Sequence, residues 1–249
     1  MTPKKAEVVS LNGTNIYYEI YGKGDPLILL HGYTQSSKYW LPFLPDYVDD
    51  FEVYLIDLQG HGKSGPFKEK LSVKSAASDV DALIKHLDLE QIKAIGFSFG
   101  GDVLFQLAFL QPRLIRSMIT IGSSGSWNAR DFPDWMDFLS YENIGNLNWM
   151  YEHQTNEAQI RSILDQFPNY SVSISDEEME SIQSKILFVL GDQDTSVSLE
   201  SVSRAKNNLF DAYLWILPNT GHGPQEGKNK QEFVRRSKEF LKDQWKKGY

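Results

Sequence analysis

The chain alternates short, largely apolar runs with longer segments whose apolar residues recur every three or four positions. The apolar runs are 27–30, 52–56, 92–97, 114–121, 186–190 and 212–217. A short apolar run bounded by turn residues is typical of a parallel strand that is buried on both faces. The segments 72–87 and 99–110 carry the apolar stripe of an amphipathic helix. This alternation predicts an α/β fold, in which helices cover both faces of a mostly parallel central sheet.

Both ends of the chain add to this plan. Residues 8–11 and 16–21 are rich in strand-forming side chains and flank Asn12-Gly13, which is a strong hairpin signal. They predict an N-terminal antiparallel hairpin at one edge of the sheet. At the other end, 233–245 is predicted to close the chain as an amphipathic helix.

The stretch 123–183 does not follow the alternation of strands and helices. It is rich in tryptophan, asparagine and acidic residues, and it has helix-like patches such as 157–166. We interpret it as a short helical cap inserted above the sheet, and not as a second domain. The 249 residues are therefore expected to form a single domain, 1–249, with this cap insertion at about 123–183.

The composition excludes several classes of function. The chain has no cysteine, which removes disulfides, thiolate metal sites and cysteine nucleophiles, and which fits a reducing cytoplasm. Its net charge of −8 disfavours nucleic acid and anionic membrane surfaces as partners. No apolar stretch approaches the roughly 20 residues of a membrane span, and residues 1–10 lack the pattern of a signal peptide. We therefore expect a cytoplasmic protein that binds neither nucleic acid nor membranes; nothing in the sequence predicts its oligomeric state.

One short motif carries the chemistry. Gly96-Phe97-Ser98-Phe99-Gly100 matches the pattern G-x-S-x-G between an apolar strand and a helix, which is the context that a nucleophilic serine needs. The sharp turn would expose the Ser98 hydroxyl above the strand ends, with the helix N-terminus directed at the reacting carbonyl. The two glycines allow the backbone segments to approach closely. The alternative is that Ser98 only caps the helix.

A serine nucleophile also requires backbone N–H groups that stabilise the developing negative charge. In sites of this type one N–H comes from the residue after the nucleophile, here Phe99, and the other from the loop after the first central strand, where Tyr33 follows His31-Gly32. We predict that Tyr33 and Phe99 form the oxyanion hole. His31 lies at the end of that strand, before the glycine, and is expected to brace the loop by hydrogen bonding.

Two further residues complete a catalytic triad. Asp194 follows the strand 186–190, and His222 follows the strand 212–217. Both would lie at the carboxyl ends of parallel strands, where the active sites of open α/β sheets form. The serine needs a base to take its proton, and the base needs an acid to fix its tautomer; these roles fall to His222 and Asp194. Asp192 is the alternative acid, and we prefer Asp194 because the extra loop residues carry it beyond the strand end.

No metal and no cofactor are predicted. Gly60, Gly62 and Gly65 spell G-x-G-x-x-G, but a proline follows and no helix begins there to receive a pyrophosphate. No spacing typical of metal ligands is present. Two other histidines remain: His86 is expected at a helix surface. His153 is expected at a solvated position in the cap, and the alternative is that it borders a pocket.

On these residues the chain resembles the α/β-hydrolase superfamily, in the group of small bacterial esterases, lactonases and cofactor-free haloperoxidases. The resemblance covers about 11–121 and 186–241 and leaves the insertion outside. The matching segments are His31-Gly32, 57–64, 96–101, 191–194 and Gly221-His222. The resemblance implies the α/β-hydrolase fold, a triad of Ser98, Asp194 and His222, and a cap that sets substrate choice. Epoxide hydrolases and haloalkane dehalogenases of this superfamily use an aspartate as nucleophile, whereas position 98 here is a serine.

These features predict a serine hydrolase that cleaves a carboxylic ester or a related acyl compound through an acyl-enzyme, with a small-molecule acyl substrate. Phe97, Trp127, Trp135 and Trp149 are candidate substrate-binding residues, because binding pockets are mostly aromatic and aliphatic; the alternative is that their rings only pack the cap. Two other kinds of function stay open. The same triad can hydrolyse lactones, carry out perhydrolysis or cleave carbon–carbon bonds, and the same fold can serve as a small-molecule receptor or signalling protein.

Overall fold

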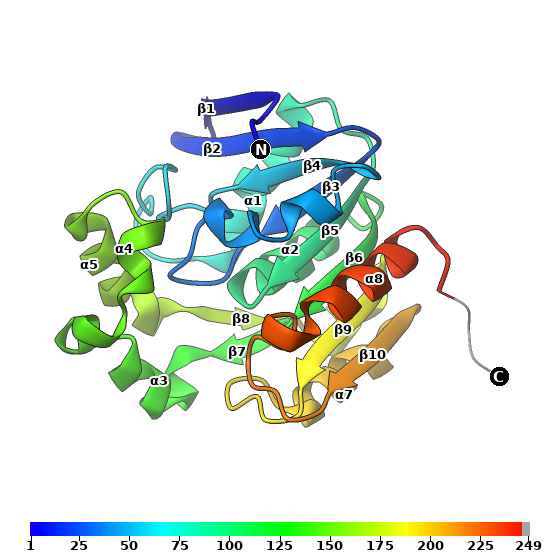
Figure 1. Ribbon diagram of the computed structural model, residues 1–249. Coiled ribbons are helices and arrows are strands. Elements are labelled where there is room, and N and C mark those ends of the chain that lie inside the picture. The colour runs from blue at the N-terminus through cyan, green and yellow to red at the C-terminus, as the bar shows by residue number, and fades with distance from the viewer. Residues whose placement is uncertain (246–249) are drawn as a thin grey trace.

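A single large sheet forms the centre of the computed structural model, which describes residues 1–245 (Figure 1). In this part of the chain eight strands form the sheet, in the order β1-β2-β4-β3-β5-β6-β9-β10. The strands are β1 (Lys5–Leu11), β2 (Thr14–Gly22), β3 (Asp25–Leu30), β4 (Phe51–Ile56), β5 (Ile92–Phe97), β6 (Ile115–Ile121), β9 (Lys185–Gly191) and β10 (Ala212–Leu217). β2 pairs antiparallel with β1 and with β4, and the other neighbours pair parallel. The predicted mostly parallel sheet, with an antiparallel hairpin at one edge, is confirmed.

Both faces of this sheet are covered, which explains why its strands are continuous apolar runs in the sequence. Along β3, Ile28 and Leu30 belong to one apolar core, and Leu27 and Leu29 belong to the other. The covering helices are α1 (Val73–His86), α2 (Phe99–Leu110) and α7 (Leu199–Asn207) on the first face, and the 3-10 helices η1 (Ser37–Trp40) and η2 (Leu44–Asp46) with α8 (Lys230–Leu241) on the second. None of the helices within residues 1–245 is long and apolar enough to cross a membrane.

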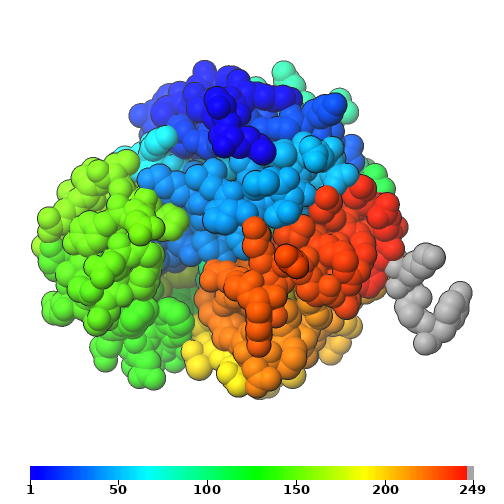
Figure 2. Space-filling model, in the orientation of Figure 1, coloured from blue at the N-terminus to red at the C-terminus, as the bar shows by residue number. Residues whose placement is uncertain are grey.

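The cap, residues 123–183, lies between β6 and β9 and gathers on one side of the molecule, in green in Figures 1 and 2. Its elements are β7 (Ser126–Asn128), η3 (Ala129–Asp131), α3 (Pro133–Phe138), η4 (Tyr141–Asn146), α4 (Trp149–His153), α5 (Glu157–Gln166), η5 (Phe167–Asn169), β8 (Ser171–Ser173) and α6 (Asp176–Ser181). The cap is mainly helical, as predicted. It also contains a small antiparallel sheet of β7 and β8, which was not predicted because strands of three residues are too short to show an alternating pattern.

Two helices of the core differ from the sequence prediction. Helix α8 begins three residues before the predicted span 233–245 and ends four residues before its end. Asp243 adopts a φ of 56°, a left-handed conformation that ends a helix. Trp245 lies beyond the end of the helix but still packs edge-on against Phe240, at a distance of 5.7 Å between the ring centroids. This packing explains why Trp245 fitted the apolar pattern of the predicted helix. Helix α7 was not predicted, because only two of its side chains are buried.

One carboxyl group is buried between the core and the cap. Asp102, one turn after Ser98 on α2, is 2% exposed. Its two oxygens accept hydrogen bonds from the backbone N–H of Gly125 (3.1 Å) and from the Tyr170 hydroxyl (2.7 Å). Burial raises the pKa of Asp102 to about 7, and these two hydrogen bonds oppose that shift only in part. Asp102 therefore ties α2 to the cap and is partly protonated near neutral pH.

This arrangement predicts that Asp102 makes the fold less stable as the pH rises from about 4 to about 8. Its pKa in the folded chain lies above the ordinary value of 3.8, so in this window the unfolded chain releases a proton that the folded chain retains. The free energy of unfolding should fall by about 2–4 kcal/mol through this group. Asp102→Asn should remove this part of the pH dependence, as measured by urea unfolding at several pH values.

Asp79→Asn is the matched control for this experiment. Asp79 is similarly buried, but its carboxylate is paired with Lys68 at 2.7 Å. The control should leave the fall in stability between pH 4 and pH 8 in place. An unchanged slope in the Asp102→Asn variant would contradict the assignment.

Candidate active site

The turn between β5 and α2 holds Ser98 in a strained backbone conformation. Its φ of 50° and ψ of −114° lie outside the regions that L-residues prefer, a strain that costs on the order of 1–3 kcal/mol. A Cβ at Gly96 would lie 2.5 Å from the carbonyl oxygen of Gly100, and a Cβ at Gly100 would lie 2.5 Å from that of Leu30. Both positions therefore require glycine, for the reason that the sequence motif indicated.

The backbone of Ser98 is held by hydrogen bonds, but its hydroxyl makes none with residues 1–245. Its N–H donates to the carbonyl oxygen of Ile121 (2.7 Å), and its own carbonyl oxygen accepts from the N–H groups of Gly101 and Asp102. The side chain makes no capping hydrogen bond to α2, which argues against Ser98 as a simple helix cap. Ser98 instead lines the largely apolar cavity described below.

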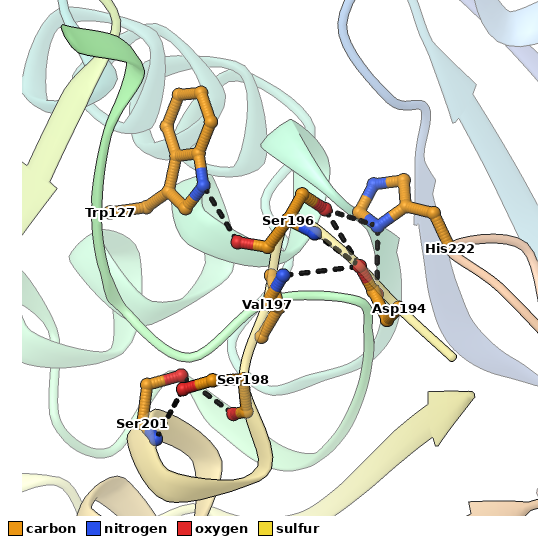
Figure 3. A network of polar contacts seen from close by, with 7 residues as sticks. All are labelled: Trp127, Asp194, Ser196, Val197, Ser198, Ser201 and His222. Carbon is orange, nitrogen blue, oxygen red and sulfur yellow. Dashed lines mark hydrogen bonds and ion pairs between the residues drawn. The ribbon is translucent and has the colours of Figure 1, made fainter. Parts of the chain in front are cut away.

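His222 and Asp194 form a close pair beside this cavity (Figure 3). They lie on the loops after β10 and β9, and His222 Nδ1 is 2.9 Å from Asp194 Oδ2. The Asp194 side chain is fully buried, whereas that of His222 is 22% exposed. Burial alone would raise the pKa of Asp194, but hydrogen bonds from His222 and Ser196 outweigh it and hold the pKa below its usual value. Asp194 is therefore ionised at neutral pH and orients the imidazole ring.

Asp192, the alternative acid, has a different position. Asp192 is exposed. Its Oδ1 accepts a hydrogen bond from the backbone N–H of Thr220 at 3.2 Å, which links the loops after β9 and β10. No hydrogen bond or ion pair joins Asp192 to His222 in residues 1–245. Two residues further along the loop, it is Asp194 that reaches the ring.

A cavity of about 220 Å³ brings the predicted residues together. It is lined by Ser98, His222 and all four predicted pocket residues, Phe97, Trp127, Trp135 and Trp149. The ring centroids of Phe97 and Trp135 lie 5.3 Å and 5.9 Å from that of His222. No hydrogen bond joins the Ser98 hydroxyl to His222 in the described part of the chain, and in free enzymes such a bond commonly tightens only when substrate binds.

The loop after β3 lies directly against the first turn of α2. A Cβ at Gly100 would also lie 2.8 Å from the carbonyl oxygen of His31, and the rings of Tyr33 and Phe99 meet edge to face at 5.6 Å. The backbone N–H groups of Tyr33 and Phe99 donate to no other group among the described residues. Both are thus available to an oxyanion, as the predicted role requires. The Phe99 ring itself is buried in the core and does not line the cavity.

Buried histidines hold this loop from the core side. His31 donates from Nδ1 to the carbonyl oxygen of Gly32 (2.8 Å) and accepts at Nε2 from the N–H of Leu58 (3.0 Å), which confirms its predicted bracing role. His61 Nε2 accepts from the N–H of Thr34 (3.3 Å). Burial lowers the pKa of both histidines to about 3, so both rings are neutral acceptors.

The cap holds the same loop from the other side, which sequence reasoning missed. His153 was expected to be solvated, and this was wrong: it is half-buried, and its Nδ1 accepts from the backbone N–H of Ser36 at 3.2 Å. The Gln154 side-chain amide donates to the carbonyl oxygens of Thr34 (2.9 Å) and Gln35 (3.1 Å). These partners are 117 to 120 positions apart in the sequence, so no local pattern indicates them.

Asp102 and Ser196 also line the cavity. Neither was predicted, because neither belongs to a recognisable motif. No group of three or more histidine, aspartate or glutamate side chains suited to hold a metal ion occurs in residues 1–245. The site thus combines a serine hydroxyl, a histidine–carboxylate pair and two free N–H groups around a mostly apolar space, which are the parts that acyl transfer needs.

Known proteins share this architecture. A sequence model described as the alpha/beta hydrolase fold matches residues 25–153. The chain is similar to a soluble epoxide hydrolase from Corynebacterium sp. strain C12, with 32% identity over 111 residues that cover 45% of this chain and 39% of that protein. It is also similar to a pimeloyl-[acyl-carrier protein] methyl ester esterase from Aeromonas hydrophila, with 35% identity over 118 residues that cover 47% of this chain and 45% of that protein. The chain thus spans less than half the length of these relatives.

A solved structure extends the likeness to nearly the whole chain. The meta-cleavage product hydrolase from Pseudomonas fluorescens IP01 superimposes with a TM-score of 0.80 over 96% of this chain and 98% of that chain, at 20% sequence identity. At this identity the likeness shows the fold alone. The match to the alpha/beta hydrolase sequence model, however, covers more than half of the chain, including the strand, turn and helix around Ser98. The chain therefore belongs to the alpha/beta hydrolase fold family.

Proposed function

We propose that this protein is a serine-dependent hydrolase that cleaves a carboxylic ester, or a related acyl compound, through a covalent acyl-enzyme. The observation that carries the proposal is the convergence of three parts on one cavity. These parts are the strained turn of Ser98, the histidine–aspartate pair at 2.9 Å, and the free N–H groups next to the serine. The family comparison supports hydrolase chemistry in general, and the serine at the turn favours acyl transfer.

In the proposed reaction, His222 Nε2 takes the proton of the Ser98 hydroxyl as Oγ attacks the carbonyl carbon. The N–H groups of Tyr33 and Phe99 stabilise the oxyanion of the tetrahedral intermediate. When this intermediate collapses, the alcohol leaves with the proton from His222, and the acyl group stays on Ser98. A water molecule then gives one proton to His222 as it attacks the acyl carbon. When the second tetrahedral intermediate collapses, the carboxylic acid is released and His222 returns this proton to Ser98 Oγ. Asp194 stabilises the imidazolium in both halves of the reaction.

The proposed substrate is a small molecule with an apolar group next to the reacting carbonyl. The cavity holds about 220 Å³, its wall is mostly apolar, and eight of its eighteen lining residues are Phe, Tyr or Trp. Phe97 and Trp135 contact the His222 ring, so they would also meet the substrate group nearest to the nucleophile. One of the similar proteins is a methyl ester esterase, which supports an ester as the substrate class. An ester also has the carbonyl group that acyl transfer to a serine requires.

Replacement of the nucleophile tests the proposal directly. The wild-type protein should turn over p-nitrophenyl esters and should be labelled by a fluorophosphonate at Ser98, as identified by peptide mass spectrometry. Ser98→Ala should abolish both, with a nearly unchanged thermal midpoint because the hydroxyl caps nothing. Ser201→Ala, on α7 outside the cavity, is the control and should retain both activities. Labelling of another serine in the Ser98→Ala variant would refute the assignment.

Replacement of aspartate by asparagine, made separately at positions 194 and 192, distinguishes the two candidate acids. Asp194→Asn should lower kcat by orders of magnitude, since the wrong histidine tautomer costs about 10⁴-fold in a comparable triad. Asp192→Asn should lower kcat by less than about threefold, because an amide oxygen can still accept from the N–H of Thr220. Steady-state kinetics with one p-nitrophenyl ester provide the measurement. The reverse ranking would transfer the role to Asp192.

Trp135 allows a test of whether the cap selects the substrate. It lines the cavity, and, unlike Trp127 and Trp149, its indole N–H donates no hydrogen bond within the described residues. Trp135→Ala should therefore shift the acyl chain-length preference by about 10- to 100-fold in kcat/KM, since burial of an aromatic ring is worth a few kcal/mol at most. The rate of labelling by a small fluorophosphonate should not change.

The chain-length profile, from acetate to decanoate, is measured together with the thermal midpoint. Tyr151→Ala is the control, because Tyr151 on α4 is 53% exposed and lies outside the cavity. It should leave the profile as it is in the wild type. If Trp135→Ala lowers the thermal midpoint and leaves the profile unchanged, the tryptophan only packs the cap and the specificity proposal fails.

A further inference from the structure

We infer that Ser196 is a positioning residue of the proposed triad: its hydroxyl keeps the His222 proton on Nδ1, and its backbone links the histidine–aspartate pair to the cap. The inference rests on the proposed function and adds a fourth side chain to that site. Ser196 Oγ lies 2.8 Å from His222 Nδ1 and 2.8 Å from Asp194 Oδ1 (Figure 3). Together with the 2.9 Å contact between His222 and Asp194, these bonds close a ring of three side chains.

The direction of each hydrogen bond follows from the charges. Asp194 is ionised, and a carboxylate only accepts hydrogen bonds. The hydroxyl proton of Ser196 therefore goes to Asp194 Oδ1, which leaves the hydroxyl oxygen as an acceptor toward the imidazole ring. His222 Nδ1 then faces two acceptors and must carry a proton. The other ring nitrogen, Nε2, remains as the proton acceptor that the Ser98 hydroxyl requires.

Ser196 is itself held in place from two sides. It is 5% exposed, and its backbone N–H donates to Asp194 Oδ1 at 2.9 Å. Its carbonyl oxygen accepts from the indole N–H of Trp127 at 2.9 Å (Figure 3). Trp127 belongs to β7 of the cap and lines the cavity. One residue therefore contacts the cap through its backbone and orients the histidine through its hydroxyl.

This arrangement has its largest effect when His222 is protonated. Hydrogen bonds to a charged group are roughly twice as strong as neutral ones, so both acceptors of Nδ1–H stabilise the imidazolium that forms during attack. Loss of the Ser196 hydroxyl removes one acceptor from His222 and one donor from Asp194. The ring is then held by a single hydrogen bond about which it can rotate. The expected result is a lower kcat with little change in KM.

Three substitutions at position 196 separate the hydroxyl from the shape of the side chain. Ser196→Thr keeps the hydroxyl. Ser196→Val gives a side chain of the same shape as threonine, with a methyl group in place of the hydroxyl. Ser196→Ala removes the hydroxyl. The valine and alanine substitutions should each lower kcat about 10- to 100-fold, the size expected for one hydrogen bond to a charged group, with KM changed less than about threefold. The threonine substitution should restore kcat to within about threefold of the wild type.

Ser201→Ala is the matched control for these substitutions. The Ser201 hydroxyl donates to the carbonyl oxygen of Ser198 at 2.8 Å and is not part of the ring (Figure 3). Its kinetics should equal those of the wild type. Thermal melts of all variants show whether each one is folded, and the valine–threonine pair keeps the comparison valid if the alanine substitution alone disturbs packing.

A second readout does not depend on turnover. In proton NMR, the Nδ1–H of His222 should give a slowly exchanging low-field resonance, identified by its absence in His222→Gln. This resonance should broaden through faster exchange with water after the valine and alanine substitutions and persist after the threonine substitution. Unchanged kcat and an unchanged resonance in both hydroxyl-free variants would overturn the inference. If the resonance depends on Ser196 but the wild type shows neither turnover nor labelling, the positioning role stands and the proposed function fails.

Discussion

The direct contact between the first turn of α2 and the end of β3 determines the geometry of the site. No side chain separates these two backbone segments, because a Cβ at Gly100 would lie 2.5 Å from the carbonyl oxygen of Leu30. The contact places the N–H groups of Phe99 and Tyr33 on the two segments that meet beside Ser98. The strain of Ser98 persists because β6 and α2 hold its N–H and its carbonyl oxygen. The surrounding elements thus impose an unfavourable backbone conformation on Ser98.

The cap takes part in the site and is more than a cover. The carbonyl oxygens of Thr34 and Gln35 accept from the Gln154 amide, and leaving one such buried group without a partner costs on the order of 1–3 kcal/mol. The loop that presents the N–H of Tyr33 therefore depends on the cap for its conformation. On the other side of the cavity, the indole N–H of Trp127 donates to Ser196 in the loop that carries Asp194. The cap therefore contacts both the loop after β3 and the loop after β9.

Two buried aspartates near the cavity show how hydrogen bonding sets the charge. Burial acts on both in the same direction, toward a raised pKa. Asp194 receives four hydrogen bonds, from His222, from the backbone and hydroxyl of Ser196, and from the backbone of Val197, and its pKa is lowered. Asp102 receives two, and its pKa rises to about 7. Hydrogen bonds and the neighbouring His222 outweigh burial at Asp194, whereas burial outweighs the two hydrogen bonds at Asp102.

The sequence by itself determined the sheet, the turn of Ser98 and the two loops that carry Asp194 and His222. These features depend on local patterns, namely apolar runs, glycines at fixed spacing and the positions of strand ends. The sequence ranked Asp194 above Asp192, but only the tertiary structure shows which of the two contacts His222, because the path of the loop determines which carboxylate reaches the ring. The tertiary structure alone also revealed the contacts of His153 and Ser196. Such contacts have no local signature, since a hydrogen bond between distant residues exists only when the fold brings both partners together.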